Sequence, residues 1–253
     1  MGGEWYSAAM KTTRNQAVGQ ESRRFLFKTL NRNALAGAIA VALGLGAGTL
    51  PAADTYDASL KAGDEHRKNK EYEPALAEYE AALGLASDSG MKALALGKKG
   101  GIYIDLKDYS SAKAAAQEAL EYKGLAPVAR VIALQVLADC QLKDDKDYVA
   151  AIDTLEQALT LEGVDWARPS LNLSLGDCYR FSGKFDKALE SYQRIPAQPS
   201  ASAGIKAIAF LNTGITCQYN LRDEDQAKAA YKKAVELNPA LKVEVDEHLV
   251  RIP

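Results

Sequence analysis

Five alanines recur along the chain at nearly equal steps, and this repetition constrains the fold more than any other feature. The steps between successive members are 37, 39, 37 and 39 residues, and the members are Ala75, Ala112, Ala151, Ala188 and Ala227. Twelve or thirteen residues before each alanine stands another small residue: Gly63, Gly100, Ala138, Gly176 and Gly214. Small residues let two helices approach closely. A unit of this length cannot bury its apolar face alone, so the spacing predicts helix pairs stacked on one another.

Aromatic residues occupy fixed places between and after these small anchors. Tyr72, Tyr109, Tyr148 and Phe185 precede four of the alanines by three residues, where the chain would turn into a second helix. A second aromatic follows the alanine by four residues in the first, fourth and fifth repeats, on the same helical face. The second and third repeats lack it, and the third carries one extra residue before its turn.

The fourth repeat resembles the tetratricopeptide repeat family most closely. It combines Leu175-Gly176-Asp177-Cys178-Tyr179 with Gly183, Phe185, Ala188 and Tyr192, and Leu237-Asn238-Pro239 is similar to the family's usual repeat ending. The resemblance covers about residues 56–240. It implies an all-α, right-handed superhelix of five helix pairs. These lie near residues 56–89, 93–126, 131–165, 169–202 and 207–240, and a capping helix follows at 241–250.

The first 53 residues have the composition of an export signal. They carry six Lys or Arg and two Glu, a balance of +4, and residues 34–50 form an uncharged Ala/Gly-rich stretch. Ser22 to Lys28 resembles a twin-arginine motif, although paired arginines are also common in general secretory signals. Seventeen apolar residues fall short of the roughly 20 that span a bilayer. We expect cleavage after Ala52 or Ala53 and no membrane span thereafter; an uncleaved anchor is the alternative.

The family resemblance places ligands on an inner wall formed by the first helix of each pair. Positions three before and one, four and five after the small anchor share that face. The wall is polar in the first repeats, where Gly97 and Gly101 leave it almost bare, and apolar in the last two. We expect a partner protein or peptide to bind at Asp177, Arg180, Phe181, Leu211, Ile215 and Tyr219. The alternative is that these residues pack against neighbouring helices.

Acidic residues at this wall argue against the carboxylate-binding clamp found in some members of the family. That clamp uses Lys, Arg and Asn, whereas this chain places Asp64, Asp139 and Asp177 one residue after the anchor. Residues 54–253 carry a balance of −6, which does not favour nucleic acid as a partner.

Chemistry-bearing residues are sparse in the sequence. The two histidines have no ligand at helical spacing, and Cys140, Cys178 and Cys217 occupy equivalent first-helix positions typical of small core residues. No phosphate-binding glycine loop, nucleophile elbow or zinc-protease motif is present. We therefore expect no catalytic residue, metal or cofactor. The sequence favours a non-enzymatic, exported scaffold of the bacterial cell envelope or periplasm. A membrane-tethered adaptor is the alternative, and an enzyme is a more distant one.

Overall fold

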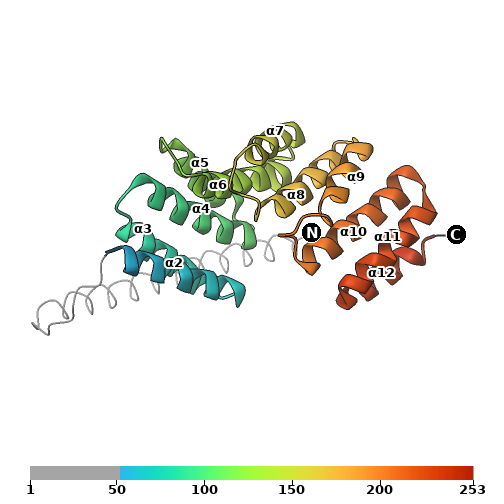
Figure 1. The fold of residues 1–253 in the computed structure, drawn as a ribbon, viewed down its shortest axis with the longest axis horizontal. Coiled ribbons are helices and arrows are strands. Elements are labelled where there is room, and N and C mark those ends of the chain that lie inside the picture. Colours follow the sequence, from blue (N-terminus) through green and yellow to red (C-terminus); the bar gives the residue numbers. More distant parts are fainter. Residues whose placement is uncertain (1–51, 253) are drawn as a thin grey trace, which may run out of the picture. The chain divides into compact units, whose positions relative to one another are not determined.

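The computed structural model describes the backbone of residues 52–252 and the side chains from residue 55 onward, within one compact unit, Pro51–Pro253. Residues 1–51 of the predicted export signal lie outside the described residues, and its last two residues, Ala52 and Ala53, begin α2. Eleven α-helices follow one another in this part of the chain (Figure 1). They are α2 (Ala52–Lys68), α3 (Tyr72–Leu85), α4 (Ser89–Asp105), α5 (Tyr109–Glu121), α6 (Pro127–Cys140), α7 (Tyr148–Leu159), α8 (Arg168–Phe181), α9 (Phe185–Arg194), α10 (Ala203–Ile215), α11 (Glu224–Leu237) and α12 (Lys242–Leu249).

Helix packing confirms the predicted solenoid of five pairs. Each helix contacts the next along the chain, so that α2 pairs with α3, α4 with α5, and so on to α10 with α11. First helices also meet directly, α4 with α6 and α8 with α10. The short α12 packs on α11 as the predicted cap. Among residues 52–252, no helix is both long and apolar enough to cross a membrane.

All ten small anchors are buried, and three of the glycines lie against a tyrosine ring. Gly63 faces Tyr79, and a Cβ atom at Gly63 would lie 2.5 Å from the Cε1 atom of that ring. Gly176 and Gly214 face Tyr192 and Tyr231 in the same way. The second aromatic of the sequence pattern therefore needs a glycine opposite it, because any side chain there would overlap the ring.

The repeats without this tyrosine fill the same space differently. In the second repeat, Val136 from α6 reaches Gly100, so that a Cβ atom there would lie 3.0 Å from Cγ1 of Val136. In the third repeat the anchor is Ala138, and buried Leu155 replaces the aromatic. In the third repeat, the alanine anchor is thus accompanied by a leucine, which is smaller than the tyrosine that accompanies a glycine anchor elsewhere.

The extra residue of the third repeat is absorbed by a π-helical turn. The segment η1 (Gln141–Asp145) continues α6, and a second one, η2 (Thr216–Leu221), continues α10. In both repeats the two small anchors stand thirteen residues apart, whereas the other three repeats have twelve. A π-turn inserts one residue without breaking the helix, so the second helix still packs on the first.

Prolines and one hydrogen bond define the connections between helix pairs. Pro127 and Pro169 each stand in the first turn of a first helix, where a missing N–H costs nothing. The irregular stretch after α9 contacts the turn before α8, because Ser200 Oγ donates to the carbonyl oxygen of Asp165 at 2.7 Å.

Candidate partner-binding site

The six predicted wall residues come from two neighbouring repeats. Asp177, Arg180 and Phe181 lie on α8, Leu211 and Ile215 on α10, and the sixth, Tyr219, on η2. Their surroundings differ, so each group is described by itself below.

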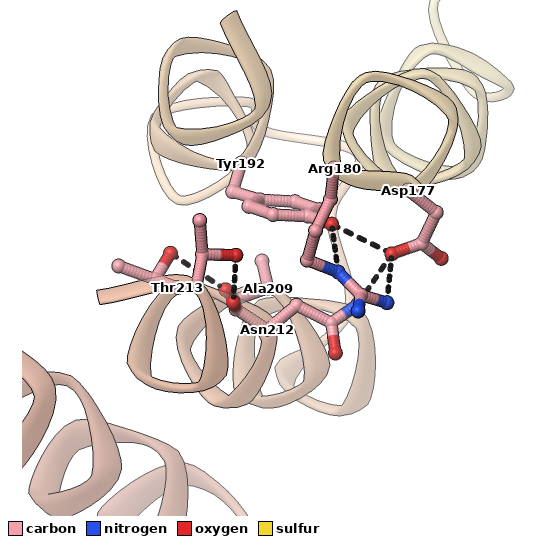
Figure 2. A network of polar contacts seen from close by, with 7 residues as sticks. Asp177, Arg180, Tyr192, Ala209, Asn212 and Thr213 are labelled. Carbon is pink, nitrogen blue, oxygen red and sulfur yellow. Dashed lines mark hydrogen bonds and ion pairs between the residues drawn. The ribbon is translucent and has the colours of Figure 1, made fainter. Parts of the chain in front are cut away.

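Asp177 is the centre of a polar network between α8, α9 and α10 (Figure 2). Its Oδ1 atom accepts hydrogen bonds from the Tyr192 hydroxyl at 2.6 Å and from Asn212 Nδ2 at 2.9 Å. Arg180 Nη2 approaches the same oxygen at 3.5 Å. The other oxygen, Oδ2, points away from the network and accepts no hydrogen bond from the residues the structure describes (Figure 2). Asp177 therefore fixes three helices with one oxygen and keeps the second available.

Burial and like charge shape the electrostatics of this wall. Desolvation raises the pKa of Asp177 above its ordinary value, although the hydrogen bond from Tyr192 and the charge of Arg180 oppose that rise. Desolvation also raises the pKa of Asp139 on α6, and the negative charge of Asp177 adds to it. The nearest cation to Asp139 is Lys143, at 3.6 Å. Burial therefore disfavours the charged form of both carboxyl groups, and the negative charge of Asp177 acts on Asp139 between the third and fourth repeats.

Phe181 is the more exposed of the two aromatics predicted on this wall. Its residue is 52% exposed, although its ring stacks on Tyr148 of α7 with centroids 5.8 Å apart. The guanidinium carbon of Arg180 lies 4.3 Å from the Phe181 ring centroid, within range of a cation–π contact. Tyr148 and Arg180 thus hold the ring in place, and about half of the residue remains accessible.

The fifth-repeat residues are partly used by the fold itself. Leu211 is 5% exposed and packs in a cluster that contains Val245 of α12. Tyr219 is 38% exposed, and its hydroxyl lies 3.0 Å from Nδ1 of His248, also on α12. Ile215 is half-buried. The capping helix therefore occupies part of the wall that the sequence pattern assigns to a partner.

The wall of the first two repeats is closed by ion pairs. Lys98 Nζ contacts both carboxylate oxygens of Asp64 at 2.7 and 2.8 Å. Arg67 donates to Asp105 at 2.8 Å and to the carbonyl oxygen of Gly101 at 3.3 Å. The guanidinium group of Arg67 occupies the space where a Cβ of Gly101 would lie. The expectation of a bare surface at Gly101 was therefore wrong, because a long side chain from the preceding repeat covers it.

The three cysteines are free and buried. Burial raises the pKa of the Cys140 thiol to about 11 and that of Cys178 to about 12, and it also raises the pKa of Cys217. Thiolate is the reactive form, so these residues have the character of core side chains. Among the described residues, no group of three or more His, Cys, Asp or Glu is placed to hold a metal ion.

Sequence reasoning missed several members of this site. Asn212 lies on α10 outside the predicted wall positions, Tyr148 lies on α7 and His248 on the cap, so their contacts depend on how neighbouring repeats stack. Tyr192 carried a partial signal, because the aromatic four residues after Ala188 was already part of the repeat pattern.

Three segments of the chain match the tetratricopeptide repeat family: residues 93–124, 169–195 and 207–241. They coincide with the second, fourth and fifth helix pairs. The photosystem I assembly protein Ycf3 of Synechococcus sp. (strain WH7803) is 29% identical over 117 residues, which cover 42% of this chain and 67% of that protein.

Solved structures show the same architecture. YrrB, described as a tetratricopeptide protein with an unusual peptide-binding site, is 25% identical with a TM-score of 0.52, over 77% of this chain and 91% of its own. A Rap protein complexed with competence and sporulation factor is 18% identical with a TM-score of 0.57, over 75% and 55% of the two chains. MamA is 23% identical with a TM-score of 0.50, over 75% and 95%. Residues 52–252 thus form a solenoid of helix pairs similar to tetratricopeptide repeats.

Proposed function

We propose that this chain is a non-enzymatic scaffold of the bacterial cell envelope, exported through its first 53 residues. It binds a protein or peptide partner on the inner wall of the fourth and fifth repeats. The observation that carries the binding site is Phe181, a half-exposed aromatic held on a rigid helix beside Arg180 and Asp177. Supported aromatics of this kind commonly anchor protein interfaces.

The relatives support a role in assembly rather than in catalysis. Ycf3 is named as an assembly protein, and YrrB is described as having a peptide-binding site. A scaffold that holds a partner during envelope assembly or secretion would use the same kind of surface.

The binding proposal is tested with Phe181→Ala in the full-length chain. Truncating an anchor aromatic typically costs at least about 2 kcal/mol of binding, roughly thirtyfold in affinity. Trp166→Ala is the matched control, because Trp166 is 51% exposed on the turn before α8, away from the wall positions. Affinity capture from the native envelope fraction, followed by quantitative mass spectrometry, should show one protein lost with Phe181→Ala and retained with Trp166→Ala.

Equal loss with both variants, or with neither, would place the partner elsewhere on the solenoid. Tyr219 is unsuitable for the first experiment, because its hydroxyl contacts His248 and its truncation would loosen α12.

The export proposal is tested on the protein purified from its native host. Its intact mass should correspond to a chain that begins near Asp54 and is recovered in the envelope fraction. An intact leader with membrane recovery would favour the tethered adaptor. An intact leader in the cytosolic fraction would end both versions of the export proposal.

A further inference from the structure

The carboxylates on the wall of the third and fourth repeats are less closely paired with cations than those on the wall of the first two repeats. In the first two repeats, Asp64 and Asp105 each have a cation within 2.8 Å. The carboxylates of Asp139 and Asp177 have none closer than 3.5 Å, since Lys143 stands 3.6 Å from one and Arg180 3.5 Å from the other. Their side chains are 18% and 25% exposed.

Incomplete pairing at partly buried carboxylates is unfavourable, and a further cation would relieve it. Removing a charge from water costs free energy unless an opposite charge or hydrogen bonds replace the lost hydration. Arg180 divides its guanidinium group between Asp177, the Tyr192 hydroxyl and the ring of Phe181. It therefore cannot neutralise Asp177 fully, and Oδ2 of Asp177 accepts nothing from any described residue (Figure 2).

An apolar contact surface stands beside these carboxyl groups. Phe181 lies one helical turn after Asp177 on α8, so the two side chains share a face. Stacking on Tyr148 holds the ring in place, which lowers the entropy lost when a ligand packs on its accessible part.

From this arrangement we propose that the inner wall selects a peptide with a lysine or arginine next to an apolar residue. The cationic side chain binds the free carboxylate oxygens at Asp139 and Asp177, and the apolar side chain packs on Phe181. This inference rests on the proposed function, because it names the chemistry of the partner for the same wall. It is the opposite preference to a clamp for carboxylate groups.

The test uses three end-blocked, fluorescein-labelled octapeptides and the full-length chain. One peptide alternates lysine with leucine, the second replaces lysine by glutamate, and the third replaces leucine by alanine. Fluorescence anisotropy should show tightest binding for the lysine–leucine peptide. Its affinity should fall as sodium chloride rises from 50 to 500 mM, because salt screens exposed charge pairs.

Variants then locate the binding. Asp139→Asn with Asp177→Asn should weaken the lysine–leucine peptide by about tenfold or more, as expected for removing the partners of a cation at an interface. Phe181→Ala should weaken it and abolish its advantage over the lysine–alanine peptide. Asp153→Asn with Asp225→Asn is the matched control, because both are exposed carboxylates, on α7 and α11, and their removal changes the net charge by the same two units.

Thermal melts followed by circular dichroism check that each variant is folded. Asp139 accepts no hydrogen bond from another helix among the described residues, so Asp139→Asn alone decides the matter if Asp177→Asn unfolds. The inference is overturned if the lysine and glutamate peptides bind alike or neither binds. It is also overturned if Asp139→Asn with Asp177→Asn binds like the Asp153 and Asp225 control. If the native partner nevertheless depends on Phe181 in the capture experiment, the proposed function is retained and only the preference for a cationic peptide is refuted.

Discussion

Replacing Gly176 by alanine should destabilise this protein, although alanine is normally the better helix residue. Gly176 lies in the middle of α8, where alanine would be favoured by about 0.5–1 kcal/mol. Its Cβ atom, however, would overlap three atoms of the Tyr192 ring. That ring is 1% exposed, and its hydroxyl is fixed by Asp177, so it cannot move aside cheaply.

The magnitude follows from these opposing effects. Overpacking of a well-packed interior costs about 1–3 kcal/mol, and an overlap with ring atoms that cannot shift belongs near the upper end. Subtracting the gain in helix propensity leaves a net loss of about 2 kcal/mol in the free energy of unfolding. In a chain of this size that corresponds to a fall in Tm of about 4–8 °C.

Gly84→Ala is the matched control. Gly84 also lies in a helix, α3, but nothing stands within 4 Å of the place its Cβ would take. The control should therefore stabilise the protein by up to about 1 kcal/mol, the opposite sign to Gly176→Ala. Urea unfolding followed by circular dichroism measures both variants against the unmodified chain.

A rescue variant tests the mechanism itself. In the third repeat, Ala138 and Leu155 take the repeat positions of Gly176 and Tyr192 and lie in one buried cluster, so Gly176→Ala with Tyr192→Leu reproduces a combination that the chain already uses. The double variant should lose less stability than the sum of the two single variants, by about 0.5–3 kcal/mol of coupling. Additive losses, or a Gly176→Ala variant as stable as the Gly84→Ala control, would refute the assignment of the glycine–tyrosine contact.

Three further outcomes are expected from single sites. Asp139→Asn should raise the free energy of unfolding at pH 7, because burial raises the native pKa of Asp139 and so makes its charged form unfavourable in the folded state. This gain should disappear below about pH 4, the ordinary aspartate pKa, where the carboxyl group is protonated in both the folded and the unfolded chain. Urea unfolding at a series of pH values measures the sign. Lys107→Gly should stabilise the chain by up to about 1 kcal/mol, because Lys107 adopts a left-handed backbone with φ of 60°. Gly183→Ala, at the equivalent turn of the fourth repeat, should destabilise the chain for the same reason. Cys140 and Cys178 should react with a thiol reagent at pH 8 only as fast as the protein unfolds, which labelling in increasing urea measures against a small-molecule thiol.

Much of the fold could be predicted from the sequence because its determinants are local and repeated. Close packing of two adjacent helices requires small residues at a fixed distance along the chain, and that requirement leaves a spacing visible in the sequence. Even the two π-turns had a sequence signal, since Ala138 and Gly214 stand thirteen rather than twelve residues before the next anchor.

The candidate site could be predicted only in part. The positions facing the inner wall follow from helical periodicity, and they correctly brought Asp177, Arg180 and Phe181 onto one helix. Periodicity does not say what lies opposite each position. The burial of Leu211 beside Val245 and the contact of Tyr219 with His248 depend on where α12 folds back.

The sequence alone therefore determined which residues pair within each repeat, because those contacts join positions at a fixed distance along the chain. Only the tertiary structure decided how the wall is used, because its contacts join different repeats. Arg67 covers Gly101 of the next repeat, and Asn212 reaches Asp177 of the preceding one. Whether a wall residue is free, covered or charge-paired depends on side chains some 35 residues away in the sequence. A local sequence pattern does not predict which residues those side chains contact.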